Sequence, residues 1–313
     1  MSGIEVLDQL IAAARLPEVV STGPVDEHGD GLDNLLTKAT LADGREVLLR
    51  ESRVQDVAPT LRAKFLEACG VGAPHLYAAN DRGAMLVDFV PGRQLSEMLA
   101  TDTVSDRTWE LTGAAFARVH AVRFPAPLQG LVGPASVVLE PVDPVDQLMA
   151  ALEGARPWLA QHQSQVLPVV DQLRSFIVRR ADNIRAEVPC LIHGDANMLN
   201  TIVAEQVTLI DWYFPAVRYP LAELSALDEH VYLTGGVGLP PAFFAGYGYA
   251  VPADLLLAYR MVGCLRWLSS AEWKRWEVDR AMPASARRRL GRWHERLLEW
   301  VGGIPALAQD LQC

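Results

Sequence analysis

Hydrophobic residues are arranged differently in the two parts of the chain. The first part holds short apolar segments bounded by glycine, proline and polar residues, a pattern typical of β-strands. These segments are 19–25, 35–41, 47–50 and 85–89. A helical spacing of apolar residues precedes them and ends at Pro17. The pattern predicts a small sheet accompanied by one helix.

From residue 108 onward, apolar residues recur mainly at the three- and four-residue spacing of helices. The segments with this spacing are 108–120, 145–160, 166–184, 252–267 and 287–301. The proline-rich segment 125–144 predicts a loop. We therefore predict an α+β fold with a small β-rich part followed by a larger, mainly helical part.

Residues 191–212 combine an apolar frame with polar residues at fixed offsets. His193, Asp195 and Asn200 have the spacing His-x-Asp-x-x-x-x-Asn, and Asp211 follows Asn200 by eleven positions. Two short apolar runs with only two residues between them separate Asn200 from Asp211, which predicts a tight hairpin. The hairpin would bring Asp211 back beside Asn200.

Phosphoryl transfer requires residue types of this kind. The acceptor hydroxyl must be oriented and its proton received, which a carboxylate at Asp195 can do. Metal ions must neutralise charge on the phosphates, and Mg²⁺ prefers oxygen ligands such as those of Asn200 and Asp211. Asp and Asn also cap turns, so any one of them alone would fit a structural role. Three at these offsets favour phosphoryl transfer.

The motif HGDxxxxN, followed by a hairpin and IDW, resembles the aminoglycoside phosphotransferase and choline kinase family, which shares the protein-kinase fold. The resemblance implies that Asp195 is the catalytic base and that Asn200 and Asp211 hold Mg²⁺. It implies a structural role for His193, which would hold the loop.

The resemblance also implies a two-lobed, protein-kinase-like architecture. Residues 1–90 would form an N-terminal lobe that covers the nucleotide, and residues 91–313 would form a C-terminal lobe that carries the catalytic and acceptor-binding residues. Arg50 stands where relatives usually have a lysine on the phosphates, and no acidic partner for it can be assigned on the helix that follows. The expected nucleotide-binding residues are Arg50, Asp88, Val90, Gly29 and Gly31. Whether the base is that of ATP or GTP is left open, because main-chain contacts leave no side-chain signature.

Beyond Trp212, Glu223 stands where the family has a structural acidic residue. Asp228, Glu229 and His230 follow on the same predicted helix. They form either a solvated charged face or an acidic wall of the acceptor pocket.

The formal net charge of −10 over 313 residues argues against a nucleic-acid partner and favours a neutral or cationic small substrate. Residues 1–10 lack a basic run, so we expect no signal peptide. The uncharged segment 231–253 is interrupted by glycine and proline, so we expect no membrane partner. The four cysteines show no CxxC pairing, which favours a cytoplasmic protein with reduced thiols.

The sequence thus predicts a Mg²⁺-dependent phosphotransferase that uses ATP or GTP and a hydroxyl of a small molecule, first of all an antibiotic such as an aminoglycoside or a nucleoside antibiotic. A metabolic kinase for a small alcohol, such as choline or homoserine, is the alternative within the same class. A non-catalytic nucleotide-binding module is the alternative from another class.

Overall fold

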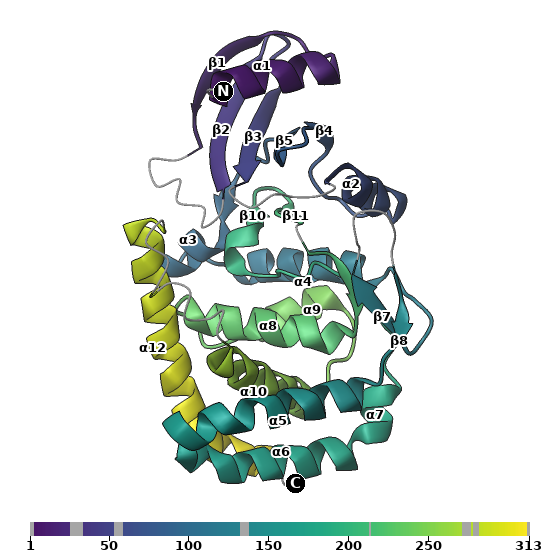
Figure 1. Cartoon of the computed structure of the whole chain (residues 1–313), viewed down its shortest axis with the longest axis vertical. Helices are drawn as coiled ribbons and strands as arrows, with labels where there is room; N and C mark the ends of the chain where they lie inside the picture. Colours follow the sequence, from purple (N-terminus) through teal and green to yellow (C-terminus); the bar gives the residue numbers. More distant parts are fainter. Residues whose placement is uncertain are drawn as a thin grey trace.

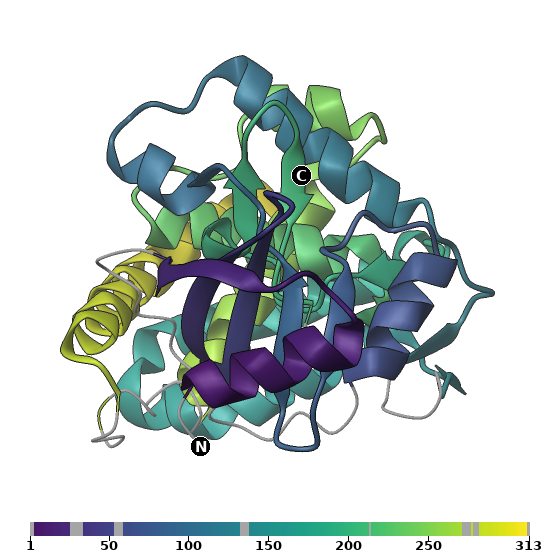
Figure 2. The ribbon, with the colours of Figure 1, turned by 90° about the horizontal axis from the view of Figure 1, so that it is seen from above.

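A computed structural model describes residues 3–25, 34–52, 59–131, 138–212, 214–270, 277 and 282–311. Figure 1 shows a β-sheet with one helix across it at one end of the molecule and a larger, mainly helical part at the other. Seen from above, the sheet lies over the helical part (Figure 2). This arrangement confirms the predicted α+β class.

The N-terminal sheet has five antiparallel strands in the order β1-β2-β3-β5-β4. Their bounds are β1 Val19–Pro24, β2 Asn34–Leu41, β3 Glu46–Ser52, β4 Leu76–Ala79 and β5 Ala84–Asp88. Helix α1 (Gly3–Ala14) buries Leu7 and Leu10 against the sheet side chains Leu49 and Leu86. Helix α2 (Pro59–Ala68) follows β3 and precedes β4 along the chain. Burial of this apolar face stabilises the sheet.

A short strand connects the two parts of the molecule. Strand β6 (Arg93–Gln94) follows β5 and pairs with β10 (Thr201–Val203), which in turn pairs with β11 (Val207–Leu209). The β10–β11 pair confirms the predicted hairpin. Its register places Thr201 opposite Leu209, so that Asn200 and Asp211 stand at the same end of the hairpin.

A second sheet of the C-terminal part has the order β8-β7-β12-β9. Its strands are β7 Leu128–Leu131, β8 Glu140–Pro141, β9 Cys190–Ile192 and β12 Ala216–Arg218. The prediction of a loop over residues 125–144 was wrong at β7 and β8. Both strands are short, and their own sequence does not indicate them; β7 is ordered by pairing with the distant β12, and β8 by pairing with β7.

The rest of the C-terminal part consists mainly of helices, of which α4 and α8 contact β9 of this sheet. They are α3 Leu95–Ala100, α4 Asp106–His120, α5 Pro144–His162, α6 Leu167–Arg179, α7 Ala181–Arg185, α8 Pro220–Leu233, α9 Pro241–Tyr247, α10 Ala253–Ser269 and α12 Ala284–Leu307, with short 3₁₀ segments η1 Ser164–Val166, η2 Met198–Asn200 and η4 Ala308–Leu311. One core cluster joins α5, α6, α10 and α12, and another joins α4, α8 and α9 beneath the hairpin. Among the described residues, no helix is long and apolar enough to cross a membrane.

Candidate active site

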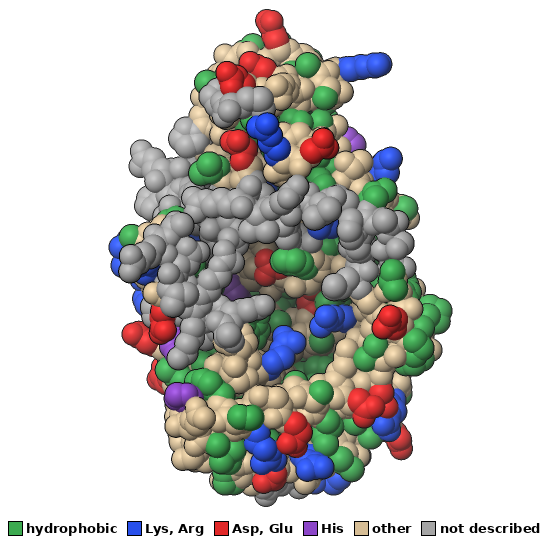
Figure 3. Space-filling model, viewed as in Figure 1, with side chains coloured by type: hydrophobic (Ala, Val, Ile, Leu, Met, Phe, Trp, Pro, Cys, Tyr) green, Lys and Arg blue, Asp and Glu red, His purple; other side chains and the backbone are tan. Residues whose placement is uncertain are grey.

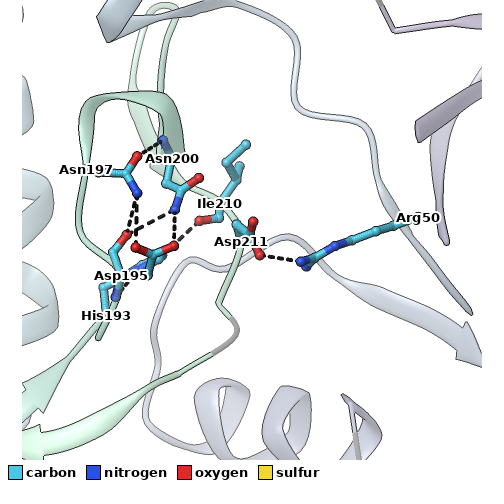
Figure 4. Close-up of polar contacts among 7 residues, drawn as sticks. All are labelled: Arg50, His193, Asp195, Asn197, Asn200, Ile210 and Asp211. Carbon is cyan, nitrogen blue, oxygen red and sulfur yellow. Dashed lines mark hydrogen bonds and ion pairs between the residues drawn. The ribbon is translucent and has the colours of Figure 1, made fainter. Parts of the chain in front are cut away.

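The loop between β9 and β10 holds Asp195 under two amide side chains (Figure 4). Asn200 Nδ2 donates to the Asp195 Oδ2 atom and to its main-chain oxygen, both at 3.0 Å. Asn197 Nδ2 donates to Asp195 Oδ1 at 3.2 Å and to the same main-chain oxygen at 3.1 Å. Asp195 is nevertheless exposed, so a substrate hydroxyl can approach it. The loop therefore fixes a carboxylate that remains accessible.

The surroundings of Asp195 change its affinity for protons. Desolvation by the surrounding protein raises the pKa of the Asp195 carboxyl above its ordinary value, and the Asp211 carboxylate acts in the same direction. The amides of Asn197 and Asn200 oppose the rise by stabilising the charged form. A raised pKa improves a carboxylate as a proton acceptor.

Asp211 lies at the end of the hairpin and points toward the N-terminal sheet. Its backbone is in the left-handed region, with φ 63°, which few residues other than glycine adopt. Arg50 reaches from β3, and its Nη2 lies 2.6 Å from Asp211 Oδ1 (Figure 4). Glu67, the carboxylate on α2, is exposed. In this structure Arg50 thus joins the two lobes through Asp211.

His193 fixes the hairpin relative to the loop. The Asp195 backbone N–H donates to His193 Nδ1 at 3.3 Å, so this nitrogen carries a lone pair. His193 Nε2 therefore carries the proton and donates to the Ile210 carbonyl at 2.8 Å. The Trp212 ring packs against the imidazole with a centroid distance of 4.4 Å. These contacts support the structural role that the family resemblance implies for His193.

Glu223 connects the loop to two helices. Its Oε1 accepts from the Gly194 N–H at 2.8 Å, and its Oε2 lies 2.9 Å from His120 Nε2 on α4. The other ring nitrogen of His120 lies 2.7 Å from the Tyr247 hydroxyl on α9. Burial acts to raise the pKa of Glu223, but hydrogen bonding to His120 and the Gly194 N–H holds it below its ordinary value.

Gly194 is required at this position. Its φ is +83°, and an added Cβ would lie 1.8 Å from the carbonyl oxygen of Phe214. Any side chain would push the loop away from the strand that follows the hairpin.

Two of the residues around Asp195 can supply oxygens to Mg²⁺. Since the Asn200 amide binds Asp195 through Nδ2, its Oδ1 is turned away from that carboxylate (Figure 4). The Asp211 carboxylate stands at the same end of the hairpin. This donor set fits a hard cation that shares its remaining positions with phosphate and water. Over the described part of the chain, no group of three His, Cys, Asp or Glu side chains is arranged to hold a metal by itself.

The predicted nucleotide-binding residues lie in different settings. The Asp88 carboxylate binds β4, because it accepts from the Tyr77 hydroxyl at 2.6 Å and from the His75 N–H at 2.9 Å. Val90 lies between β5 and β6, where the chain passes from one lobe to the other. Gly29 and Gly31 fall outside the described residues.

The three predicted acceptor residues make internal contacts, each of a different kind. Asp228 accepts from the Leu239 N–H and from Arg260 Nη1, both at 2.6 Å. Glu229 is buried beside Cys264. His230 accepts from the Met198 N–H through Nδ1 at 3.2 Å. A solvated charged face is therefore the wrong description of this cluster, and its contacts favour internal roles over an acidic acceptor wall.

The burial of Glu229 predicts a pH-dependent stability. Burial raises the pKa of Glu229 to about 7, although the Cys264 thiol and neighbouring arginines lower it. The native carboxyl keeps its proton up to about pH 7, whereas the unfolded one loses it near 4.5, so native stability is lost as pH rises through this window. The loss should be on the order of 3 kcal/mol.

Glu229→Gln removes this ionisation. We expect the melting temperature of the variant, minus that of wild type, to increase between pH 4.5 and pH 7 and then to level off. The exposed Glu67→Gln is the control and should show no such trend. Equal differences at pH 5 and pH 8 for Glu229→Gln would exclude a buried, ionising Glu229.

The sequence did not indicate the contacts that three residues make at the site, namely Asn197, Tyr247 and His120. Asn197 lies at one of the unspecified positions of the motif HGDxxxxN, and its role depends on the folded loop. Tyr247 is buried against His120, 127 positions away in the chain. His120 is fully buried and contacts Glu223. Its contact with Glu223 joins residues 103 positions apart, which no local sequence pattern predicts.

The Phosphotransferase enzyme family matches residues 25–262 of the chain. No curated protein sequence matches this chain. Among solved structures, a choline/ethanolamine kinase family protein from Mesorhizobium loti is 17% identical, covers 96% of this chain and 99% of its own, and has a TM-score of 0.60.

Two further solved structures have the same fold. The ternary complex of APH(2″)-IIa with streptomycin and ATP is 15% identical, covers 96% of this chain and 97% of that one, and has a TM-score of 0.55. A putative fructosamine-3-kinase from Thermobifida fusca is 17% identical, covers 94% and 98%, and has a TM-score of 0.55. These likenesses confirm the predicted two-lobed, kinase-like fold.

Proposed function

This chain belongs to the phosphotransferase enzyme family, and on that premise we propose that it transfers the γ-phosphate of ATP or GTP to a hydroxyl of a small molecule, with Mg²⁺ as the metal. The observation that carries the proposal is the cluster of Asp195, Asn200 and Asp211. Hydrogen bonds and the hairpin hold these three side chains together at the boundary of the two lobes.

Asp195 would orient the acceptor hydroxyl and receive its proton as the oxygen attacks. Its carboxylate is accessible, its pKa is raised, and two amides fix its direction. These properties are those expected of a general base. The two amides leave the carboxylate few orientations, so little reorganisation is needed when substrate binds.

Asn200 Oδ1 and the Asp211 carboxylate would hold Mg²⁺ together with oxygens of the nucleotide. The metal, when bound, supplies positive charge that stabilises the phosphates during transfer. The Asp211 carboxylate, one oxygen of which lies against Arg50, would turn to the metal. Arg50 would then bind the nucleotide phosphates.

The nucleotide would lie between the lobes. Main-chain groups near Asp88 and Val90 would bind the base, and the nucleotide-binding role of Gly29 and Gly31 stays a prediction from the sequence. A solved relative in complex with ATP supports a nucleotide donor for this fold. Free thiols at Cys69, Cys190 and Cys264 fit a cytoplasmic enzyme, where ATP and GTP are available.

Arg50 provides a test of the phosphate site. Arg50→Ala should weaken ATP or GTP binding by about tenfold to 100-fold, because charge-assisted bonds to phosphate are lost, and should change nucleoside affinity little. Arg50→Lys, which keeps the charge but not the two-pronged geometry, should fall in between. Calorimetric titration of each protein with nucleoside and triphosphate measures both. An equal loss of affinity for nucleoside and triphosphate would show that Arg50 has a purely structural role.

For the acceptor we propose an antibiotic, either an aminoglycoside or a nucleoside antibiotic, with a small metabolic alcohol as the second candidate. The acidic net charge favours a neutral or cationic molecule. Figure 3 shows a hollow in the middle of one face, below the N-terminal part, with charged and hydrophobic side chains around it. A hollow of mixed character suits a sizeable polar molecule.

An acceptor panel tests the proposal. Purified protein, Mg²⁺ and ATP or GTP are incubated with aminoglycosides, nucleoside antibiotics, choline, ethanolamine and homoserine, and mass spectrometry detects the addition of one phosphate. We expect one phosphate on an antibiotic. Turnover of a small alcohol with no antibiotic modified would establish the second candidate. Nucleotide binding without turnover of any acceptor or of the nucleotide itself would favour a non-catalytic module.

A further inference from the structure

The 3₁₀ turn η2, which carries Asn200, has a side-chain acceptor for each of its three backbone N–H groups. The Leu199 and Asn200 N–H groups donate to Asn197 Oδ1 at 2.9 and 3.0 Å. The Met198 N–H donates to Nδ1 of His230, which lies on α8 and 32 positions away in the chain. One acceptor, Asn197 Oδ1, thus belongs to the loop itself and serves two N–H groups, and the other comes from a helix.

The contact between Met198 and His230 is well placed to fix the loop. The Met198 side chain is fully buried in the core beneath the hairpin. A buried N–H without an acceptor is costly, so the turn keeps its position only where His230 offers a lone pair. Asn200, two residues further on, directs its amide at Asp195.

The ring of His230 stays in the form that can accept. Its Nδ1 receives a hydrogen bond, so the proton must reside on Nε2. Burial and the nearby charge of Arg289 lower the pKa of His230 to about 3. The ring therefore remains neutral at physiological pH.

A second helix fixes the orientation of this ring. Trp293 on α12 meets the imidazole edge-on, with 4.7 Å between ring centroids and 76° between the planes. The Arg289 guanidinium lies over the Trp293 ring, 5.8 Å from its centroid. Helix α12 packs against α8 along the side of the C-terminal part (Figure 1). The acceptor for Met198 is thus held from both helices.

We propose that His230 is a positioning residue for phosphoryl transfer: by accepting the Met198 N–H, it holds the turn that aims Asn200 at Asp195, and α12 keeps its ring in place through Trp293. The inference rests on the proposed function, because it assumes that Asp195 and Asn200 are catalytic. It differs from both alternatives that the sequence left open for His230, a solvated face and an acceptor wall.

Two substitutions separate positioning from packing. His230→Asn and His230→Leu are similar in size, and both lose the ring that packs on Trp293. Asn places Oδ1 where Nδ1 stands and so keeps an acceptor, whereas Leu offers none. We expect kcat of His230→Leu to fall about tenfold or more below that of His230→Asn, with acceptor KM nearly unchanged and with closely similar melting temperatures.

Hydrogen exchange at the Met198 amide gives a readout that does not depend on turnover. It should accelerate at least tenfold in His230→Leu relative to His230→Asn, at equal global stability. Equal kcat and equal exchange in the two variants would overturn the inference while leaving the proposed function intact. Absence of turnover in wild type would instead sink the proposed function, and the exchange result would still decide whether His230 holds the turn.

If His230→Leu does not fold, nitrogen NMR of the wild-type ring decides the question. We expect the neutral Nε2–H form, with Nδ1 shifted by its hydrogen bond, from pH 8 down to pH 5. A ring protonated on Nδ1 in this range could not accept from Met198 and would contradict the proposal.

Discussion

Replacing Asp195 by Asn should lower kcat by about 100-fold or more and leave nucleotide affinity within a few-fold of wild type. The substitution keeps the shape of the side chain. Its single amide oxygen can accept from only one of Asn197 and Asn200, which now donate to Oδ1 and Oδ2 respectively, but both amides can keep their bonds to the main-chain oxygen of residue 195. What is lost is the basic oxygen that receives the hydroxyl proton.

Steady-state kinetics and calorimetry with nucleotide measure the two quantities separately. Asp182→Asn, at an exposed position on α7, is a matched control and should leave both unchanged. Wild-type turnover in Asp195→Asn would exclude the role of base. A fall in kcat that is matched by an equal fall in nucleotide affinity would point to a disrupted lobe boundary instead.

Replacing Asp211 by Ala should reduce kcat by about 1000-fold or more, since metal-derived charge stabilisation amounts to several kcal/mol. The variant should also lose the Mg²⁺ dependence of nucleotide binding. Asp211→Asn retains an oxygen ligand without the charge, so its kcat should lie between those of wild type and Asp211→Ala. Because Arg50 loses its carboxylate partner in both variants, any effect of that ion pair alone will be shared by them.

Calorimetric titration with and without Mg²⁺ tests the prediction. A variant that retains the metal dependence of wild type would show that Asp211 does not hold the metal. In that case the ion pair with Arg50 would remain as a contact between the lobes.

Local spacing in the sequence was enough to predict much of the fold and the residues at the centre of the site. The short apolar segments predicted four strands of the N-terminal sheet, and the two-residue gap predicted the β10–β11 hairpin. Because the hairpin is local, the spacing of Asn200 and Asp211 translates directly into their proximity. The predicted single helix over 166–184 is instead interrupted between Arg179 and Ala181, with no glycine or proline there to signal it.

Long-range contacts could not be predicted in this way. Glu223 meets Gly194 across 29 positions, and His120 meets Tyr247 across 127. Such pairings depend on how α8 and α9 pack, which no local pattern specifies. The choice between the two alternatives for residues 228–230 also depended on the fold, because consecutive residues on a helix point in different directions and here make separate contacts.

The structure of the protein with Mn²⁺ in place of Mg²⁺ and a non-hydrolysable ATP or GTP analogue tests the central claim most directly. Anomalous scattering locates the metal. We expect it to be bound by Asn200 Oδ1, the Asp211 carboxylate and phosphate oxygens, with the Arg50 guanidinium on the phosphates and the terminal phosphate facing Asp195. Nucleotide and metal bound elsewhere, with the Arg50–Asp211 ion pair intact, would contradict the assignment of this cluster as the phosphotransfer centre.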